Sequence, residues 1–272
     1  MADDDGLVTL EFQVRHALIL AFVVGLFAGG FFMSAVNAVA GPTGAIVQPQ
    51  DGSSGDTQPS PSPSGTQGTQ GGSQDSQVSV SGIDFKNDPV IGSSDAPVTV
   101  VAWEDYQCPF CQRFEQNAFP KIKKNYIDTG KVRFVFKDFA FLGSDSTSGS
   151  VASQCVWRQV GDSSPAAWSR WKNAMFDNQD GENSGWGSQD DIIAMTRNVS
   201  GVDASQLESC MNSNAQAIQQ ELSTDKSQGQ NAGISGTPGF VVYADGSDTG
   251  TKIVGAQPYS RFQSVIDSKL SG

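Results

Sequence analysis

A long uncharged apolar run near the N-terminus, from Ala17 to Ala40, is the strongest hydrophobic signal in the chain. A transmembrane helix needs about 20 apolar residues, so this run is long enough to cross a bilayer. Small residues ahead of Gly41 also fit a signal-peptide cleavage site, but the acidic segment before the run is unlike the basic start of a signal peptide. The pattern therefore predicts a membrane anchor at 16–40, with a cleaved signal peptide as the alternative.

The segments on either side of this run differ in composition. Residues 1–15 form a short tail whose Arg15 is the only base near the run, which favours a cytoplasmic N-terminus and an extracytoplasmic remainder. Residues 41–82 are rich in Gly, Ser, Thr, Gln and Pro and hold almost no aliphatic residue to bury. Such a segment cannot offset the entropy cost of ordering, so we expect a flexible linker. The protein is thus predicted to be a single-pass membrane protein, and the signal-peptide alternative exports the remainder as well.

The pattern from residue 83 onward is that of a folded α/β domain. Val98–Trp103 is a β-branched apolar run that predicts a buried strand, and Lys131–Lys137 alternates as a second strand does. A helix is expected between them from Cys108-Pro109, broken or kinked at Pro120. A β-α-β order implies two parallel strands joined by a right-handed crossover.

Residues 144–230 predict a succession of helices rather than strands. Three helix starts are recognisable, at Ser164 before a proline, at Ser188 and at Asp203. A hairpin follows at Gly239–Tyr243 and Thr251–Val254, and the chain ends in a helix at Tyr259–Leu270. The predicted order is β-α-β, a helical insertion, then β-β-α, within a domain at 83–272.

Composition narrows the chemistry that this domain can carry. The chain has 272 residues, a net charge of -12 and one histidine, His16, which lies beside the apolar run. A Ser-His-Asp triad, a Cys-His protease pair and a multi-histidine metal site all need histidines that the domain lacks. Nucleic-acid binding needs clustered bases, whereas the 17 Lys and Arg are scattered. Four cysteines remain as the reactive side chains.

Cys108 and Cys111 form a C-x-x-C motif after a strand and at a helix start, the context in which this motif indicates redox chemistry. The spacing brings both sulfurs to one helical turn, where unpaired backbone N–H groups stabilise a thiolate. We expect Cys108 to be the nucleophile and Cys111 the resolving thiol, with Pro109 and Phe110 between them. Half a zinc site and a purely structural disulfide are the alternatives.

Thr237-Pro238 precedes the late hairpin. In a C-x-x-C protein a proline at this place is expected to follow a cis peptide bond and to present the backbone of Thr237 to a substrate. An ordinary trans loop proline is the alternative. Phe110, Trp103 and Phe139 are candidates for apolar surface near the sulfurs, although side chains of this kind more often lie in the core.

Five segments in this order resemble the membrane-tethered type of DsbA-like thiol:disulfide oxidoreductases: EDYQCPFCQRFE, KVRFVFKDF, VASQCVWRQ, SGTPGFVV and VGAQPYSRF. The resemblance spans residues 81–272. It implies a thioredoxin fold with an inserted α-helical domain, a redox-active pair at Cys108 and Cys111, and a cis proline at Pro238. It also implies reduced, unfolded exported proteins as substrates and a membrane quinone-linked oxidase, DsbB-like or vitamin K epoxide reductase-like, that reoxidises the dithiol. No metal or cofactor is implied.

Two positions depart from the family pattern. The best-known members have His where this chain has Phe110, so we expect the pKa of Cys108 to lie below the free value of about 8.5 but above the extreme of about 3.5. The family often has an acidic residue where this chain has Ala102. Glu104 lies two residues further along, on the same face of the strand, and is the candidate proton acceptor for the resolving thiol; a solvated strand-end residue is the alternative.

Cys155 and Cys210 lie in the helical insertion, and in an oxidising exterior an even cysteine count favours a structural disulfide between them. Two free thiols or a second redox relay are the alternatives. Asn198-Val199-Ser200 is a glycosylation sequon in the exported portion. The sequence therefore predicts a thioredoxin-fold disulfide oxidase; a reductase or isomerase of the same fold, or a non-redox peptide-binding holdase, are the other hypotheses.

Overall fold

The structure is a computed structural model that describes residues 76–272. The predicted tail at 1–15, the predicted anchor at 16–40 and most of the predicted linker lie outside these residues. Between residues 76 and 272, no helix combines the length and the apolar character that a membrane crossing requires.

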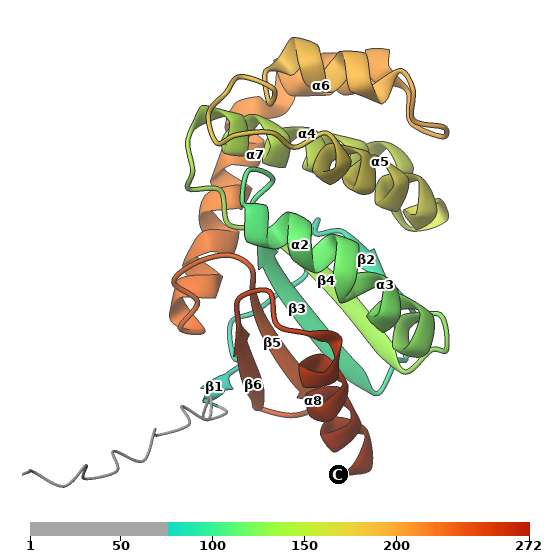
Figure 1. The fold of residues 1–272 in the computed structure, drawn as a ribbon, viewed down its shortest axis with the longest axis vertical. Helices are drawn as coiled ribbons and strands as arrows, with labels where there is room; N and C mark the ends of the chain where they lie inside the picture. The colour runs from blue at the N-terminus through green and yellow to red at the C-terminus, as the bar shows by residue number, and fades with distance from the viewer. Residues whose placement is uncertain (1–75) are drawn as a thin grey trace, which may run out of the picture. The chain divides into compact units, whose positions relative to one another are not determined.

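A six-stranded mixed sheet forms the centre of the domain, in the order β1-β6-β5-β3-β4-β2 (Figure 1). Strands β3 (Val98–Glu104) and β4 (Val132–Asp138) are parallel neighbours, as the β-α-β pattern predicted. Strands β5 (Gly239–Ala244) and β6 (Thr249–Val254) form the predicted hairpin, and β5 pairs antiparallel with β3. The first cysteine therefore follows the most buried strand of the sheet.

Two short edge strands were not predicted from the sequence. β1 (Gln77–Ser79) pairs with β6, and β2 (Val90–Ile91) pairs with β4, both antiparallel. Residues 77–79 had been assigned to the end of the flexible linker, because three mostly polar residues carry no periodic signal. They are ordered instead by backbone pairing, with Val78 opposite Gly250.

Helices cover both faces of the sheet (Figure 1). One face is covered by α2 (Pro109–Asn117), α3 (Phe119–Ile122), a π-helical turn (Lys123–Ile127) and α8 (Tyr259–Ser271). The predicted interruption near Pro120 is confirmed, since α2 ends before α3 begins. The C-terminal part of α7 (Ala204–Asn231) lies on the other face, where Gly229 leaves room for the Trp103 ring and the Trp103 indole N–H donates to the Asp225 carbonyl at 2.9 Å.

The region between β4 and β5 is helical, as predicted, with α4 (Ser144–Val160), a 3-10 turn (Gly161–Ser163), α5 (Pro165–Asp177), α6 (Gln189–Thr196) and α7. The three predicted helix starts are confirmed. The Ser188 side chain accepts a hydrogen bond from the Asp191 amide, and the Asp203 side chain accepts from the amides of Ser205 and Gln206. These caps satisfy backbone N–H groups that a helix start leaves unpaired.

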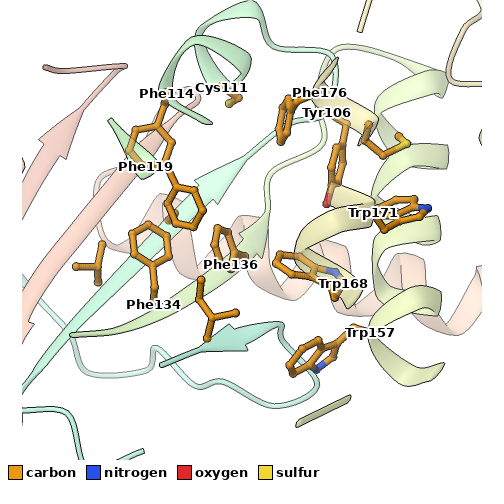
Figure 2. Close-up of a cluster of buried hydrophobic side chains, with 14 of the residues drawn as sticks. Tyr106, Cys111, Phe114, Phe119, Phe134, Phe136, Trp157, Trp168, Trp171 and Phe176 are labelled. Atoms are coloured by element: carbon orange, nitrogen blue, oxygen red, sulfur yellow. The ribbon is translucent and has the colours of Figure 1, made fainter. Parts of the chain in front are cut away.

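Alternate residues of β3 enter two separate apolar clusters, because successive side chains of a strand point to opposite faces. The larger cluster continues without a break from the sheet into the helical region. Figure 2 shows its aromatic side chains, with Phe136 against Trp168 at a ring-centroid distance of 4.9 Å and Tyr106 against Phe176 at 5.2 Å. Cys111 lies at the edge of this cluster beside Phe114 (Figure 2). Cys111 is therefore part of the core.

Candidate active site

Cys108 lies where β3 passes into α2. It is the N-cap residue of α2, Pro109 occupies the first helical turn, and the Cys108 carbonyl accepts from the amides of Cys111 at 3.0 Å and Gln112 at 3.2 Å. Proline suits this position because its missing N–H would be unpaired there in any case. Cys108 and Cys111 are both free thiols in the structure, and both are buried. The sequence-predicted pair is thus brought to one helical turn.

The surroundings of the two thiols shift their pKa values in opposite directions. Hydrogen bonding from the Cys111 side chain is the largest cause that lowers the pKa of Cys108 to about 6; the Thr237 side chain and the backbone N–H groups of Phe110 and Cys111 add to it, and burial opposes it. This value lies between the limits expected from the sequence. Burial instead raises the pKa of Cys111 well above its ordinary value, and the neighbouring Cys108 and the charge of Glu104 raise it further. Cys108 is therefore the thiolate-forming sulfur and Cys111 the protonated one.

Thr237 faces Cys108 from the loop before β5. The Thr237-Pro238 peptide bond is cis, as predicted. The Cys108 thiol donates a hydrogen bond to the Thr237 carbonyl oxygen at 3.3 Å. Although 129 residues separate the two positions in sequence, the antiparallel pairing of β5 with β3 brings them together.

Glu104 is buried, so the solvated alternative for this residue is wrong. Its carboxylate pairs with Lys172 of α5 at 2.9 Å, and Lys172 also pairs with Glu115 of α2. Burial and the charge of Glu104 raise the pKa of Glu115 well above its ordinary value, against the lowering effect of Lys172. The charge of Glu104 also raises the pKa of Cys111, which couples this cluster to the sulfur.

Aromatic rings enclose the Lys172 ammonium on several sides. The Phe136 ring centroid lies 4.1 Å from Nζ, and the Phe119 and Phe176 centroids each lie 5.2 Å away. Ring faces attract a cation, so these contacts offset part of the cost of removing Lys172 from water. Sequence reasoning missed Lys172 and Glu115. The only signal for Glu115 was its place one helical turn after Cys111, and Lys172 carried none.

Polar side chains that the sequence did not single out fix the loop before Cys108. Asp105 accepts hydrogen bonds from Ser146 Oγ at 2.6 Å and from the amide of Phe141 at 2.9 Å. Gln179 donates to the carbonyl oxygens of Tyr106 and Cys108, at 2.5 Å and 3.3 Å. Residues of the helical region thus hold the loop that leads into Cys108.

Three large apolar side chains in the described part of the chain are exposed, one of them within the C-x-x-C motif. Phe110 is 52% exposed and lies under the Arg113 guanidinium, and Phe141 is 46% exposed. Trp103 and Phe139, the other two residues considered for this surface, are buried core residues. A third exposed apolar residue, Val254, pairs across the hairpin with Gly239, which directly follows Pro238.

The second cysteine pair forms a disulfide. Cys155 of α4 and Cys210 of α7 form a disulfide between positions 55 residues apart, as expected from the even cysteine count. Within the described residues, no group of three or more Cys, His, Asp or Glu is arranged to hold a metal ion.

Comparison with known proteins agrees with this geometry. A family model described as thioredoxin matches residues 84–268. Disulfide bond formation protein D of Bacillus subtilis is 30% identical over 188 residues, which cover 69% of this chain and 79% of the relative. The chain belongs to the DsbA-like thiol:disulfide oxidoreductases of the thioredoxin family.

Solved structures of this family show the same architecture. Oxidised BdbD from Bacillus subtilis matches with a TM-score of 0.59 at 28% identity, covering 73% of this chain and 98% of that one. Wolbachia pipientis alpha-DsbA1 matches with a TM-score of 0.57 at 27% identity, covering 70% and 94%. The thioredoxin-like fold with its added helices is therefore a family property, and Lys172 lies in one of those helices.

Proposed function

We propose that the protein is a disulfide oxidase that donates a Cys108–Cys111 disulfide to reduced, unfolded proteins outside the cytoplasm. A substrate thiolate attacks Cys108 Sγ, the Cys108–Cys111 bond breaks, and Cys111 leaves as a thiolate that takes up a proton. A second substrate thiolate then attacks the substrate sulfur of the mixed disulfide and releases the Cys108 thiolate. The substrate loses two electrons and gains a disulfide, and the active-site pair gains both electrons.

The pairing of a low-pKa Cys108 with a high-pKa Cys111 carries this proposal. A Cys108 with a pKa of about 6 is a good leaving group at neutral pH and stabilises the reduced enzyme, which favours donation of the disulfide. Cys111 must be protonated when it leaves, because burial disfavours its thiolate. Glu115, whose carboxyl is driven toward its protonated form, and Glu104 are the nearby groups suited to exchange that proton.

The exposed apolar side chains support unfolded proteins as the substrate class. Phe110, Phe141 and Val254 are the three large hydrophobic residues that the structure exposes between residues 76 and 272. Phe110 lies within the C-x-x-C motif, Asp105 ties the Phe141 amide to the loop before Cys108, and Val254 pairs beside the cis proline. Exposed apolar side chains in the segments that carry the C-x-x-C motif and border the cis proline favour apolar partners, and unfolded chains offer apolar side chains.

The location and the reoxidant complete the proposal. The apolar run at 16–40 anchors the domain on the outer face of the membrane as a single-pass protein, and the linker keeps the domain near the surface. A membrane quinone-linked oxidase, DsbB-like or vitamin K epoxide reductase-like, returns the Cys108–Cys111 pair to the disulfide. The similarity to disulfide bond formation protein D supports this assignment.

Acid trapping and alkylation of intact cells test direction and substrates together. We expect Cys108 and Cys111 to be mostly disulfide in the wild type, and Cys111→Ala to accumulate mixed disulfides on Cys108. Cys108→Ala is the control that must lose these adducts. A pair found mostly as dithiol would indicate a reductase or isomerase, and full activity of Cys108→Ala would indicate a non-redox holdase.

A further inference from the structure

A hollow of about 440 Å³ lies among α5, α6 and the loop that joins them, and no cysteine lines it. The apolar side chains of Met175, Ile192, Met195 and Trp186 line it. Asn198 is one of its few polar lining residues. Small-ligand sites have this size and this mixture of apolar surface with few polar groups. The redox mechanism uses none of these residues.

Asn198 is the acceptor position of Asn198-Val199-Ser200, and this triplet is the only N-x-S/T sequon in the 272 residues. Asn198 and Ser200 are exposed in the turn directly after α6. The Asn198 amide nitrogen donates one long bond, 3.4 Å, to the Ala194 carbonyl. An N-glycosylated asparagine keeps one N–H, so this bond does not compete with modification.

The turn that carries the sequon is held in place while its side chains stay accessible. The Asn198 backbone amide donates to Met195 at 3.0 Å, and the Val199 amide donates to Thr196 at 2.9 Å. Arg170 of α5 donates to the Ser200 carbonyl through Nε at 3.1 Å and through Nη2 at 3.0 Å. The acceptor side chain therefore projects from a fixed position at the rim of the hollow.

Trp186 is the second observation that points to a ligand. It is partly exposed, it lines the hollow, and its buried indole N–H has no hydrogen-bond partner among the described residues. A buried donor without an acceptor requires an explanation, since such groups are nearly always paired in native proteins. The exposed part of the indole ring offers a flat apolar surface, which suits the apolar face of a sugar ring.

We propose that Asn198 is N-glycosylated and that the first sugars of the glycan occupy this hollow against Trp186. The inference rests on the extracytoplasmic location in the proposed function. The Asn198 Nδ2 atom attacks the anomeric carbon of a polyprenol-phosphate-linked oligosaccharide. An N–C bond forms, the anomeric C–O bond to phosphate breaks, the lipid phosphate leaves, and the amide releases one proton. No atom changes oxidation state.

Mass spectrometry of the full-length protein purified from its own membranes tests the modification. We expect the reduced tryptic peptide 198–226 to carry an added glycan mass in the wild type. Asn198→Gln and Ser200→Ala should lose it, Ser200→Thr should keep it, and Asn212→Gln, an exposed asparagine outside a sequon, should keep it. An unmodified Asn198 in the wild-type protein would overturn the proposal.

A double-mutant cycle tests whether the glycan packs on Trp186. Asn198→Gln should lower the thermal unfolding midpoint of the wild type, and should lower it less in a Trp186→Leu background, because the contact is already lost. Equal shifts in both backgrounds would show that the glycan does not contact Trp186.

Intact cells are first treated with a membrane-impermeant phosphine reductant, which opens the Cys108–Cys111 disulfide, and Cys108 is then labelled with a membrane-impermeant maleimide. This labelling separates the inference from the proposed function. Labelling together with an unmodified Asn198 overturns the glycan alone. Absence of labelling, when permeabilised cells do label, overturns the extracytoplasmic location and with it both proposals.

Discussion

Two lysines are buried between residues 76 and 272, one on each face of the sheet, and their surroundings differ. Lys137 on β4 donates to Asp88 at 2.6 Å and to Asp225 of α7 at 2.7 Å. The second Asp225 oxygen accepts from the Asp138 amide. Gln154 of α4 completes this group with a 2.7 Å bond to the Asp138 carboxylate. Here the ion pairs are supported by further hydrogen bonds that join three elements.

The cluster around Lys172 is built with fewer hydrogen bonds. Within the described residues, the carboxyl groups of Glu104 and Glu115 have no polar partner besides Lys172 and each other. The other neighbours of the Lys172 ammonium are aromatic rings. Buried charges with few partners remain sensitive to any change of charge nearby. The Lys137 cluster is therefore suited to hold the fold, and the Lys172 cluster to respond when Cys111 gains or loses a proton.

The largest expected effects come from removing either lysine. Lys137→Met and Lys172→Met each leave buried carboxylates without a cation, so each should lower the free energy of unfolding by about 3–5 kcal/mol. Urea unfolding measures this. Only Lys172→Met should also change the pH profile of thiol alkylation, because only its cluster is coupled to Cys111. An altered profile in Lys137→Met would remove the distinction; if Lys172→Met does not fold, Glu115→Gln makes the same comparison.

Opening the second cysteine pair should act like the loss of a structural contact. The disulfide joins α4, which carries Gln154, to α7, which carries Asp225. Chain entropy for a loop of this length predicts that Cys155→Ser/Cys210→Ser loses about 4 kcal/mol of stability. The alkylation rate of Cys108, measured below the new unfolding midpoint, should stay unchanged. A changed Cys108 rate would assign the second pair to the redox chemistry instead.

The sequence predicted those parts of the fold whose information is local. The parallel pair β3 and β4, the hairpin, the helix starts at Ser188 and Asp203 and the C-x-x-C all follow from periodicity, caps or spacing. β1 and β2 could not be predicted, because edge strands of three and two residues are defined by their partners and not by their own pattern.

In the candidate site, Cys108, Cys111 and Pro238 could be predicted, because the local sequence and the family resemblance both indicated them. Lys172 could not be predicted, since its role depends on α5 packing over α2 and β3, and a lysine in an amphipathic helix ordinarily faces water. The sequence singled out Glu104 as a candidate site residue, but it did not predict the ion pair of Glu104 with Lys172. Phe139 and Phe141 are two residues apart in sequence, and only the packing of α7 decides that the first is buried and the second exposed.

Glu104→Gln tests the coupling to the sulfur more directly. Since the charge of Glu104 raises the pKa of Cys111, its removal should lower that pKa and make Cys111 leave faster, so that disulfide exchange speeds up by roughly a few-fold at neutral pH. Alkylation of Cys111 against pH in a Cys108→Ala background measures the shift. Asp88→Asn, whose carboxyl pairs with Lys137 on the other face of the sheet, is the matched control and should not move it. An unmoved Cys111 titration in Glu104→Gln would exclude a role for Glu104 in proton exchange.

The last prediction concerns stability against pH, and Asp138→Asn isolates the part of it that Asp138 contributes. Burial raises the pKa of Asp138 to about 7 and that of Asp88 to about 8. From about pH 4 to these values the folded state therefore holds protons that the unfolded state has released, and each group lowers the free energy of unfolding by at most about 1.4 kcal/mol per pH unit as pH rises. Asp138→Asn should flatten this decline up to pH 7 in urea unfolding.

Asp203 provides the control of opposite sign for that experiment. Hydrogen bonds from Ser205 and Gln206 lower the pKa of Asp203, so its contribution is present above its unfolded pKa and is lost only as pH falls through the lower folded value. Asp203→Asn should therefore leave the decline between pH 4 and pH 7 intact. If Asp138→Asn also left the decline intact, Asp138 would not hold a proton over this range. Asp88, whose carboxyl pairs with Lys137 and whose pKa burial raises to about 8, would then be the next group of the Lys137 cluster to replace.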